Sequence, residues 1–275
     1  MRPLQHTVQT AGSVSSIAEA LAEARRTGRL LDDMALSSIA ASSDGYAVQA
    51  EVAVLAGADI AGWKIALPPD GEVIAAPIFA DGVSVSRKPL PERACFKDGV
   101  ECEIAFRIDR ALSMRPPEGY GVADVVPAIG GAMAAFELLS SRLANGFASS
   151  RPRLLADNLG NGGAVLGELR PDWRELDFER IGVTLRVDGV PVVSQRGGNS
   201  VGDPLRAVAA LANHLAERGS GFIPGMIVLT GAYTGVHRVR ADQTICAAFA
   251  GLAPVEVTLR RARPTQEMEK THAGG

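Results

Sequence analysis

The chain has 275 residues, of which 47% are hydrophobic and 21% are charged, a composition typical of a folded protein and not of a disordered one. Its formal net charge of −3 excludes the basic excess with which proteins bind a nucleic-acid backbone, so no nucleic-acid partner is expected. The three cysteines, odd in number and without metal-binding spacing, argue against disulfides or structural zinc and favour a cytoplasmic protein.

The hydropathy pattern predicts no targeting or membrane segment. The first twelve residues are polar, which is unlike a signal peptide. The longest apolar stretch, residues 125–139, is interrupted by proline, glycine and glutamate and is too short to span a bilayer. No membrane partner is therefore expected.

The N-terminal quarter is predicted to be mainly helical. Residues 13–26 place apolar side chains on one helical face after a run of capping serines, and residues 44–55 form a second alanine-rich helix that ends near Gly57. A short strand at residues 60–67 follows, and Pro68 and Pro69 end it.

From about residue 75 the pattern changes to strands and turns. A hairpin is predicted around Asp188-Gly189, and a helix begins at Asp203-Pro204 and stops at Gly219. A short helix is expected within residues 123–133, and strands are expected at residues 100–108, 134–139, 181–187, 190–195, 226–230, 244–249 and 254–259. The prediction is an α+β protein with a helical N-terminal part (residues 1–75), a β-rich domain (76–263) and a disordered tail (264–275).

Two carboxylates in the strand at residues 100–108 are candidate metal ligands. Glu101 and Glu103 lie two apart and therefore project from one face of the strand, opposite Cys102 and Phe106. On a solvated face such a pair is tolerable, but beside apolar strands its repulsion and desolvation would require a divalent cation. The local sequence leaves both readings open.

Glu137 stands in an almost wholly apolar segment, Ala134–Leu139. A carboxylate in such a setting either faces water at the end of an element or is buried with a partner. Arg142 is one candidate partner, and a metal shared with Glu101 and Glu103 is the other. Because the four histidines are not paired at metal spacing, the ligands are expected to be oxygen atoms, which suit Mg²⁺ or Mn²⁺.

Two further polar features stand among apolar residues. Lys64 follows Trp63, and partial burial would lower its pKa and suit it to acid–base work, unless its ammonium group simply reaches the solvent. Asp157-Asn158 precedes a glycine-rich stretch and forms either a plain turn or the polar wall of a pocket. The glycines match neither a nucleotide-binding loop nor the elbow of a serine nucleophile.

These segments, in their order and spacing, resemble the 2-keto-4-pentenoate hydratase and 4-oxalocrotonate decarboxylase branch of the fumarylacetoacetate hydrolase superfamily. The resemblance covers about residues 15 to 260. It is carried by residues 46–49 (YAVQ), 62–65 (GWKI), 76–79 (APIF), 100–106 (VECEIAF), 136–142 (FELLSSR), 156–158 (ADN), 202–205 (GDPL), 224–232 (PGMIVLTGA), 239–242 (VRAD) and 248–252 (AFAGL).

The resemblance implies a mixed, β-roll-like domain of the fumarylacetoacetate hydrolase C-terminal type behind a small helical part. It implies a metal site, an active-site lysine and a pocket for a 2-oxo or 2-hydroxydienoic acid. The residues so implied are Glu101, Glu103 and Glu137 as metal ligands, Lys64 and Asp157 as catalytic residues, and Leu67, Asp81, Asn158 and Thr230 as substrate-binding residues.

Two segments depart from the family pattern and place the identity of the substrate in question. The proline-rich segment 68–73 replaces a loop that helps to seat the substrate in relatives. The segment 232–237 differs from the usual small, apolar continuation, so Tyr233 or His237 is expected to line an altered pocket.

The function implied by the resemblance is a metal-dependent lyase of aromatic-compound catabolism that adds water to a 2-hydroxy-2,4-dienoate. One alternative is a 4-oxalocrotonate-type decarboxylase, since hydration and decarboxylation need the same electron sink. The other alternative is a non-catalytic partner subunit of such an enzyme. A hydrolase is disfavoured because no His-Glu pair stands near His6. A homo-oligomer, associated with a related pathway enzyme, is expected by the same analogy.

Overall fold

The computed structural model describes residues 13–90, 94–112 and 116–259. Helix α1 (Val14–Thr27) is capped by the Ser13 side chain and ends at Gly28, which has a left-handed φ of 73°. Helix α2 (Ser42–Ala56) ends in the same way at Gly57. Both helices agree with the sequence prediction to within two residues, because capping residues and glycine stops are local signals.

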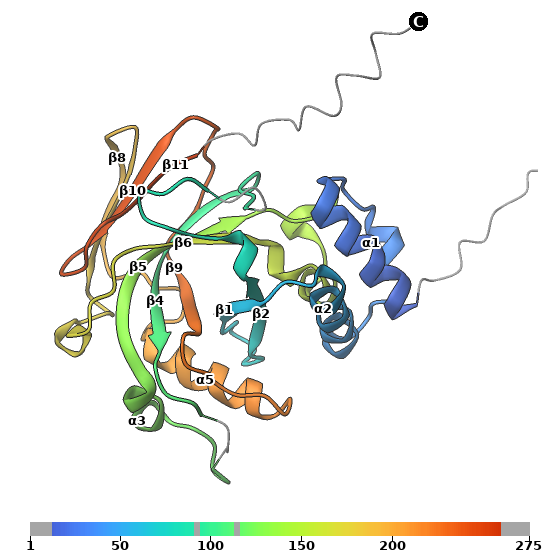
Figure 1. The fold of residues 1–275 in the computed structure, drawn as a ribbon, viewed down its shortest axis with the longest axis horizontal. Coiled ribbons are helices and arrows are strands. Elements are labelled where there is room, and N and C mark those ends of the chain that lie inside the picture. The colour runs from blue at the N-terminus through green and yellow to red at the C-terminus, as the bar shows by residue number, and fades with distance from the viewer. Residues whose placement is uncertain (1–12, 91–93, 113–115, 260–275) are drawn as a thin grey trace, which may run out of the picture.

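The N-terminal helices have a small hydrophobic core of their own. Ile17 and Leu21 of α1 pack with Val48 and Val52 of α2, and helix α4 (Arg151–Ala156) closes the cluster. Figure 1 shows α1 and α2 side by side at one end of the molecule, next to the edge of the main sheet. The helical part therefore rests on a segment that comes much later in the chain.

The main sheet has seven strands in the order β2-β1-β9-β4-β5-β6-β3. The pairs β1–β9 and β3–β6 are parallel and the other neighbours are antiparallel, so the sheet is mixed. The strands are β1 (Ile60–Ala66), β2 (Ile74–Phe79), β3 (Val83–Val85), β4 (Gly99–Ile108), β5 (Ile129–Leu139), β6 (Asn161–Leu166) and β9 (Ile227–His237).

A second sheet of four strands has the order β11-β10-β7-β8 and lies on the opposite side of the molecule from α1 and α2 (Figure 1). The main hydrophobic core fills the space between the two sheets and helix α5 (Pro204–Ala216), with Phe106 and Trp173 near its centre. The strands are β7 (Gly182–Val187), β8 (Val190–Arg196), β10 (Thr244–Phe249) and β11 (Val255–Thr258). The expected α+β class and the predicted hairpin at Asp188-Gly189 are confirmed.

Several elements differ from the sequence prediction. Helix α3 (Val122–Val125) is shorter than the region 123–133, and β5 begins at residue 129 because buried small residues continue the strand. Strands β2, β3 and β6 were not predicted individually. β2 contains Pro77, which an edge strand tolerates, and β6 contains Gly162 and Gly163, which carry no strand signal.

The strand predicted at residues 60–67 is confirmed as β1, which is hydrogen-bonded between β2 and β9 in the main sheet although it lies in the mainly helical segment 1–75. Gly62 permits this position, because a Cβ atom there would lie 2.0 Å from the carbonyl oxygen of Ile227. The predicted disordered tail, residues 264–275, lies outside the described residues. Within the described ranges, no helix combines the length and the apolar composition needed to cross a membrane.

Candidate metal centre

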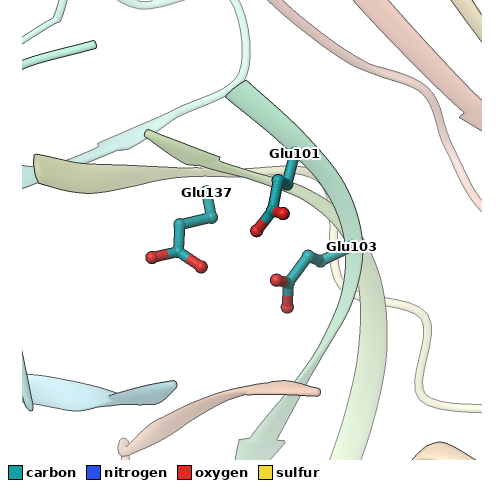
Figure 2. A group of neighbouring side chains, drawn as sticks. All are labelled: Glu101, Glu103 and Glu137. Atoms are coloured by element: carbon teal, nitrogen blue, oxygen red, sulfur yellow. The ribbon is translucent and has the colours of Figure 1, made fainter. Parts of the chain in front are cut away.

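Three carboxylates converge on the concave side of the main sheet. Glu101 and Glu103 project from one face of β4, and Glu137 lies directly opposite Glu101 on β5. Their ligand atoms all lie within 4.8 Å of one another, and Figure 2 shows the three side chains directed toward a common point. The predicted alternation along β4 is confirmed, since Cys102, Ile104 and Phe106 on the opposite face belong to the main core.

Burial makes this cluster electrostatically costly. Glu137 is fully buried and Glu103 is 2% exposed. Burial and the charge of Glu137 raise the pKa of Glu101 to about 7, although Lys64 opposes the shift. Burial, Glu137 and Glu101 also raise the pKa of Glu103 well above its ordinary value. Burial and mutual repulsion therefore make it costly to ionise the two carboxylates of β4 beside Glu137.

Lys64 supplies the positive charge that directly contacts the cluster. It reaches in from β1, and its Nζ lies 2.6 Å from Oε1 of Glu137 and 3.4 Å from the carbonyl oxygen of Leu159. Burial lowers the pKa of Lys64, but attraction to Glu137, Glu101 and Glu103 outweighs this effect and raises it. The expectation that burial would depress the pKa of Lys64 is therefore wrong for the protein without a bound cation.

The cluster has the properties of a divalent-cation site. Lys64 balances one of the three carboxylate charges, and a divalent cation would balance the other two. The buried Oε2 atom of Glu137 has no hydrogen-bond partner among the described residues, which is costly unless a ligand uses it. Oxygen-only donors suit Mg²⁺, Mn²⁺ or Ca²⁺. The residues present therefore fit a bound metal.

Two supporting contacts were not predicted from the sequence. Asn161 Nδ2 donates to Oε1 of Glu137 at 2.9 Å, and the backbone N–H of Gly231 donates to Oε2 of Glu103 at 2.9 Å. Asn161 is a polar residue at the start of the buried strand β6, and this contrast with its neighbours could have identified it from the sequence. The Gly231 contact depends on an irregularity in β9, where the register against β4 shifts between Glu103 and Ala105, and no sequence signal indicates it.

Asp157, expected to be catalytic, lies in a buried ion pair. Its Oδ1 accepts from Nε of Arg142, and its Oδ2 accepts from the hydroxyl of Ser141 at 2.8 Å and from the backbone N–H of Arg142 at 2.9 Å. Arg142 had been considered as a partner of Glu137; it pairs instead with Asp157, and Lys64 pairs with Glu137. These contacts favour a structural role for Asp157 over the expected catalytic one.

An Asp157→Asn variant is therefore expected to be destabilised by about 3 kcal/mol, because it leaves the buried guanidinium of Arg142 without its counter-charge. Urea unfolding at neutral pH measures this loss. The folded variant should bind divalent cations as the wild type does. Unchanged stability together with a large fall in turnover would restore the catalytic assignment.

The four expected substrate-binding residues differ in burial and in hydrogen bonding. Asn158 is 1% exposed, and neither atom of its side-chain amide has a partner in the described part of the chain. Thr230 is fully buried and donates its hydroxyl to the carbonyl oxygen of Ile104 at 2.8 Å, one residue before the Gly231 contact. Leu67 follows β1 and packs against the main core. Asn158 is thus the member with free hydrogen-bonding capacity.

Asp81 is exposed in a short turn after β2. It lines a hollow of about 310 Å³ between this turn and helices α1 and α2, together with Phe79 and Arg25. Among the described residues that line this hollow, none is Lys64 or one of the three carboxylates. Its expected role in substrate binding therefore has no contact to support it.

The two residues expected to line an altered pocket also differ in position. Tyr233 is 2% exposed, belongs to the main core, and donates its hydroxyl to the carbonyl oxygen of Phe178 at 3.0 Å. The expectation is therefore wrong for Tyr233. His237 ends β9, with Nε2 3.0 Å from the carbonyl oxygen of Thr234.

The fold and the cluster can be compared with known proteins. The chain is 28% identical over 263 residues to the 2-keto-4-pentenoate hydratase of Burkholderia vietnamiensis (strain G4), covering 90% of this chain and 97% of that protein. It is 31% identical over 181 residues to the 2-keto-4-pentenoate hydratase of Paraburkholderia phymatum, covering 66% of this chain and 68% of the relative. The chain belongs to this hydratase family.

The predicted membership of the 2-keto-4-pentenoate hydratase branch is therefore confirmed. The fold of the chain is also that of a 4-oxalocrotonate decarboxylase from Pseudomonas putida G7, solved in complex with magnesium and adipate. The TM-score is 0.76 at 24% identity, and the alignment covers 89% of this chain and 96% of the other. No protein-family model matches the chain.

Proposed function

We propose that this protein is a divalent-metal-dependent hydratase that adds water to a 2-hydroxy-2,4-dienoate, and that Glu101, Glu103 and Glu137 hold the metal. The observation that carries the proposal is the buried carboxylate cluster, with Lys64 beside it and one oxygen of Glu137 unpartnered. The hydratase from Burkholderia vietnamiensis supports the choice of reaction, because nearly its whole length aligns with this chain.

The metal is proposed to be Mg²⁺ or Mn²⁺. When bound, such a cation supplies Lewis acidity toward the keto and carboxylate oxygens of a 2-oxo acid. The three glutamates would hold it, and the burial of Glu103 and Glu137 keeps bulk water from competing for their positions.

Lys64 is proposed to transfer a proton during conversion of the dienol substrate to its keto form. The Lys64 side chain is 12% exposed and its ammonium group lies against Glu137, so it is positioned to relay the proton of the 2-hydroxyl group to carbon 5 as the dienol converts to the 2-oxo-3-enoate. Water then adds at carbon 4, and a proton is delivered at carbon 3. The product is a 4-hydroxy-2-oxo acid, which contains all the atoms of the substrate and one water.

The side chain of Asn158 is proposed to bind the substrate. An amide offers both a donor and an acceptor, and both are buried without a partner. A bound carboxylate or enol group would satisfy them. Asn158 follows Asp157, whose ion pair with Arg142 holds this turn in place.

Decarboxylation of a 4-oxalocrotonate-type acid is the second candidate, favoured by the close similarity in fold to a decarboxylase. It needs the same metal and the same stabilisation of an enolate, so the carboxylate cluster serves both reactions. A non-catalytic partner subunit is disfavoured, because the three carboxylates are all present within 4.8 Å of one another and Lys64 contacts Glu137.

Removal of the metal is expected to abolish turnover. The protein is treated with a chelator, desalted and assayed by ultraviolet absorbance with 2-hydroxypenta-2,4-dienoate. Activity should be lost and should return on addition of Mg²⁺ or Mn²⁺, with 4-hydroxy-2-oxopentanoate as the product. Metal-independent turnover would contradict the proposal, and turnover of 4-oxalocrotonate alone would favour the decarboxylase.

The proposal extends to a cytoplasmic location, a homo-oligomer and association with a related enzyme of aromatic catabolism. These points rest on analogy with the family. Light scattering on the purified protein, alone and mixed with a related decarboxylase, tests the last two.

A further inference from the structure

The two oxygens of the Glu137 carboxylate have unequal surroundings. Oε1 accepts from Lys64 Nζ at 2.6 Å and from Asn161 Nδ2 at 2.9 Å. Oε2 is buried and has no hydrogen-bond partner among the described residues. Two donors therefore occupy one oxygen and leave the other free.

The backbone of Asn161 is held from two sides. Its carbonyl oxygen accepts from Arg142 Nη1 at 2.8 Å and from Arg25 Nη2 at 3.2 Å. The residue is 2% exposed and begins β6, where it pairs with Leu139. Arg25 comes from helix α1 and Arg142 from the loop after β5, so distant segments place this one residue.

The amide of Asn161 is a donor that stays neutral at all ordinary pH values, unlike the ammonium of Lys64. Since it is fixed by its backbone, it restricts rotation of the Glu137 carboxylate and keeps Oε1 engaged. Only Oε2 then remains for a cation. A carboxylate that offers one oxygen suits the small octahedral shell of Mg²⁺ or Mn²⁺, whereas Ca²⁺ takes six to eight oxygens and often both atoms of a carboxylate.

We infer that Asn161 is a positioning residue that holds Glu137 as a one-oxygen ligand, and that it thereby makes the site favour Mg²⁺ or Mn²⁺ over Ca²⁺. The inference rests on the proposed metal site. It concerns selectivity among cations and is independent of which dienoate or oxo acid is the substrate.

The test replaces Asn161 by leucine, whose side chain has the same branched arrangement of four heavy atoms and no donor. The backbone contacts to Arg25 and Arg142 remain available, so the fold is expected to persist, and circular dichroism and thermal unfolding without metal check this. Calorimetry on the chelator-treated, full-length protein then measures the Kd of Mg²⁺ and of Ca²⁺ in the absence of substrate. Asn161→Ala repeats the experiment if leucine does not fit, and Asn145→Ala is the matched control at an exposed position.

Loss of the amide should weaken Mg²⁺ binding about 10- to 100-fold, as losing a hydrogen bond to a metal ligand usually does, and should change Ca²⁺ binding by less than about threefold. The Asn145→Ala control should bind both ions as the wild type does. A change in the ratio of the Mg²⁺ and Ca²⁺ affinities would show that Asn161 positions Glu137, because a general loosening of the site would weaken the binding of both ions equally.

Equal weakening of both ions, or no change in either, would overturn the inference and leave the proposed function intact. A wild-type protein that binds no divalent cation would overturn both. A wild-type protein that binds Mg²⁺ but does not hydrate the dienoate would remove only the proposed reaction, and the shifted affinity ratio would still support the role of Asn161.

Discussion

A Glu137→Gln variant is expected to lose divalent-cation binding and turnover together. The substitution preserves the size of a fully buried side chain, but it removes the negative charge and replaces one carboxylate oxygen by an NH2 group, which donates and cannot bind a cation. We expect the Kd of Mg²⁺ to rise by at least about 100-fold, more than for loss of a supporting hydrogen bond. Turnover at a fixed Mg²⁺ concentration should fall by about 10³-fold or more, since three ligands become two.

Calorimetry and thermal unfolding measure this effect without reference to the substrate. An excess of Mg²⁺ at about 100 times its Kd should stabilise the wild type by about 3 kcal/mol and should leave Glu137→Gln unchanged. Glu168→Gln, at an exposed carboxylate beyond β6, is the matched control and should behave as the wild type. Normal metal affinity in Glu137→Gln would refute Glu137 as a ligand.

A Lys64→Met variant is expected to separate metal binding from chemistry. Methionine keeps an unbranched side chain of similar length and removes the ammonium group 2.6 Å from Glu137. Release of Oε1 from this ion pair leaves the site more negative, so Mg²⁺ should bind as tightly as in the wild type or more tightly. Turnover should fall by about 10²- to 10⁴-fold, the usual contribution of a positioned proton donor.

The comparison with Lys64→Arg shows what the lysine contributes. Arginine keeps the positive charge but does not release its proton, so it should preserve metal affinity near that of the wild type and fail to restore turnover. If Lys64→Arg is fully active, charge alone is needed. If Lys64→Met retains both metal binding and normal kcat, Lys64 has no part in the reaction.

Much of the fold could be predicted from local sequence patterns. The helices α1, α2 and α5, the alternation along β4 and the hairpin at Asp188-Gly189 follow from caps, stops and strand patterns that depend on near neighbours. Strands β2, β3 and β6 were not predicted, because β2 contains small residues and a proline, β3 has only three residues, and β6 contains two glycines. Such segments form strands because of the neighbouring strands with which they pair.

The candidate site was likewise predicted only in part from the sequence. The spacing of Glu101 and Glu103 predicted that both project from one face of a strand, and the apolar setting of Glu137 made a buried, partnered carboxylate one of two readings; the family resemblance joined the three as metal ligands. The residues alone marked Lys64 as unusual, and the family resemblance assigned it to the active site and supplied the reaction. The catalytic reading of Asp157 failed to anticipate its pairing with Arg142, because either residue alone matches several possible partners.

The sequence by itself thus determined which strand faces carry negative charge, since side chains alternate along a strand whatever surrounds it. Only the tertiary structure decided which groups meet those charges. Lys64 reaches Glu137 across the concave side of the sheet, although β9 and β4 lie between β1 and β5, and the Gly231 N–H reaches Glu103 through the irregular register of β9. Asn161 reaches Glu137 because β6 lies beside β5, while arginines from two other segments hold its carbonyl. Such contacts depend on strand order and register, which are set by packing between segments far apart in the chain.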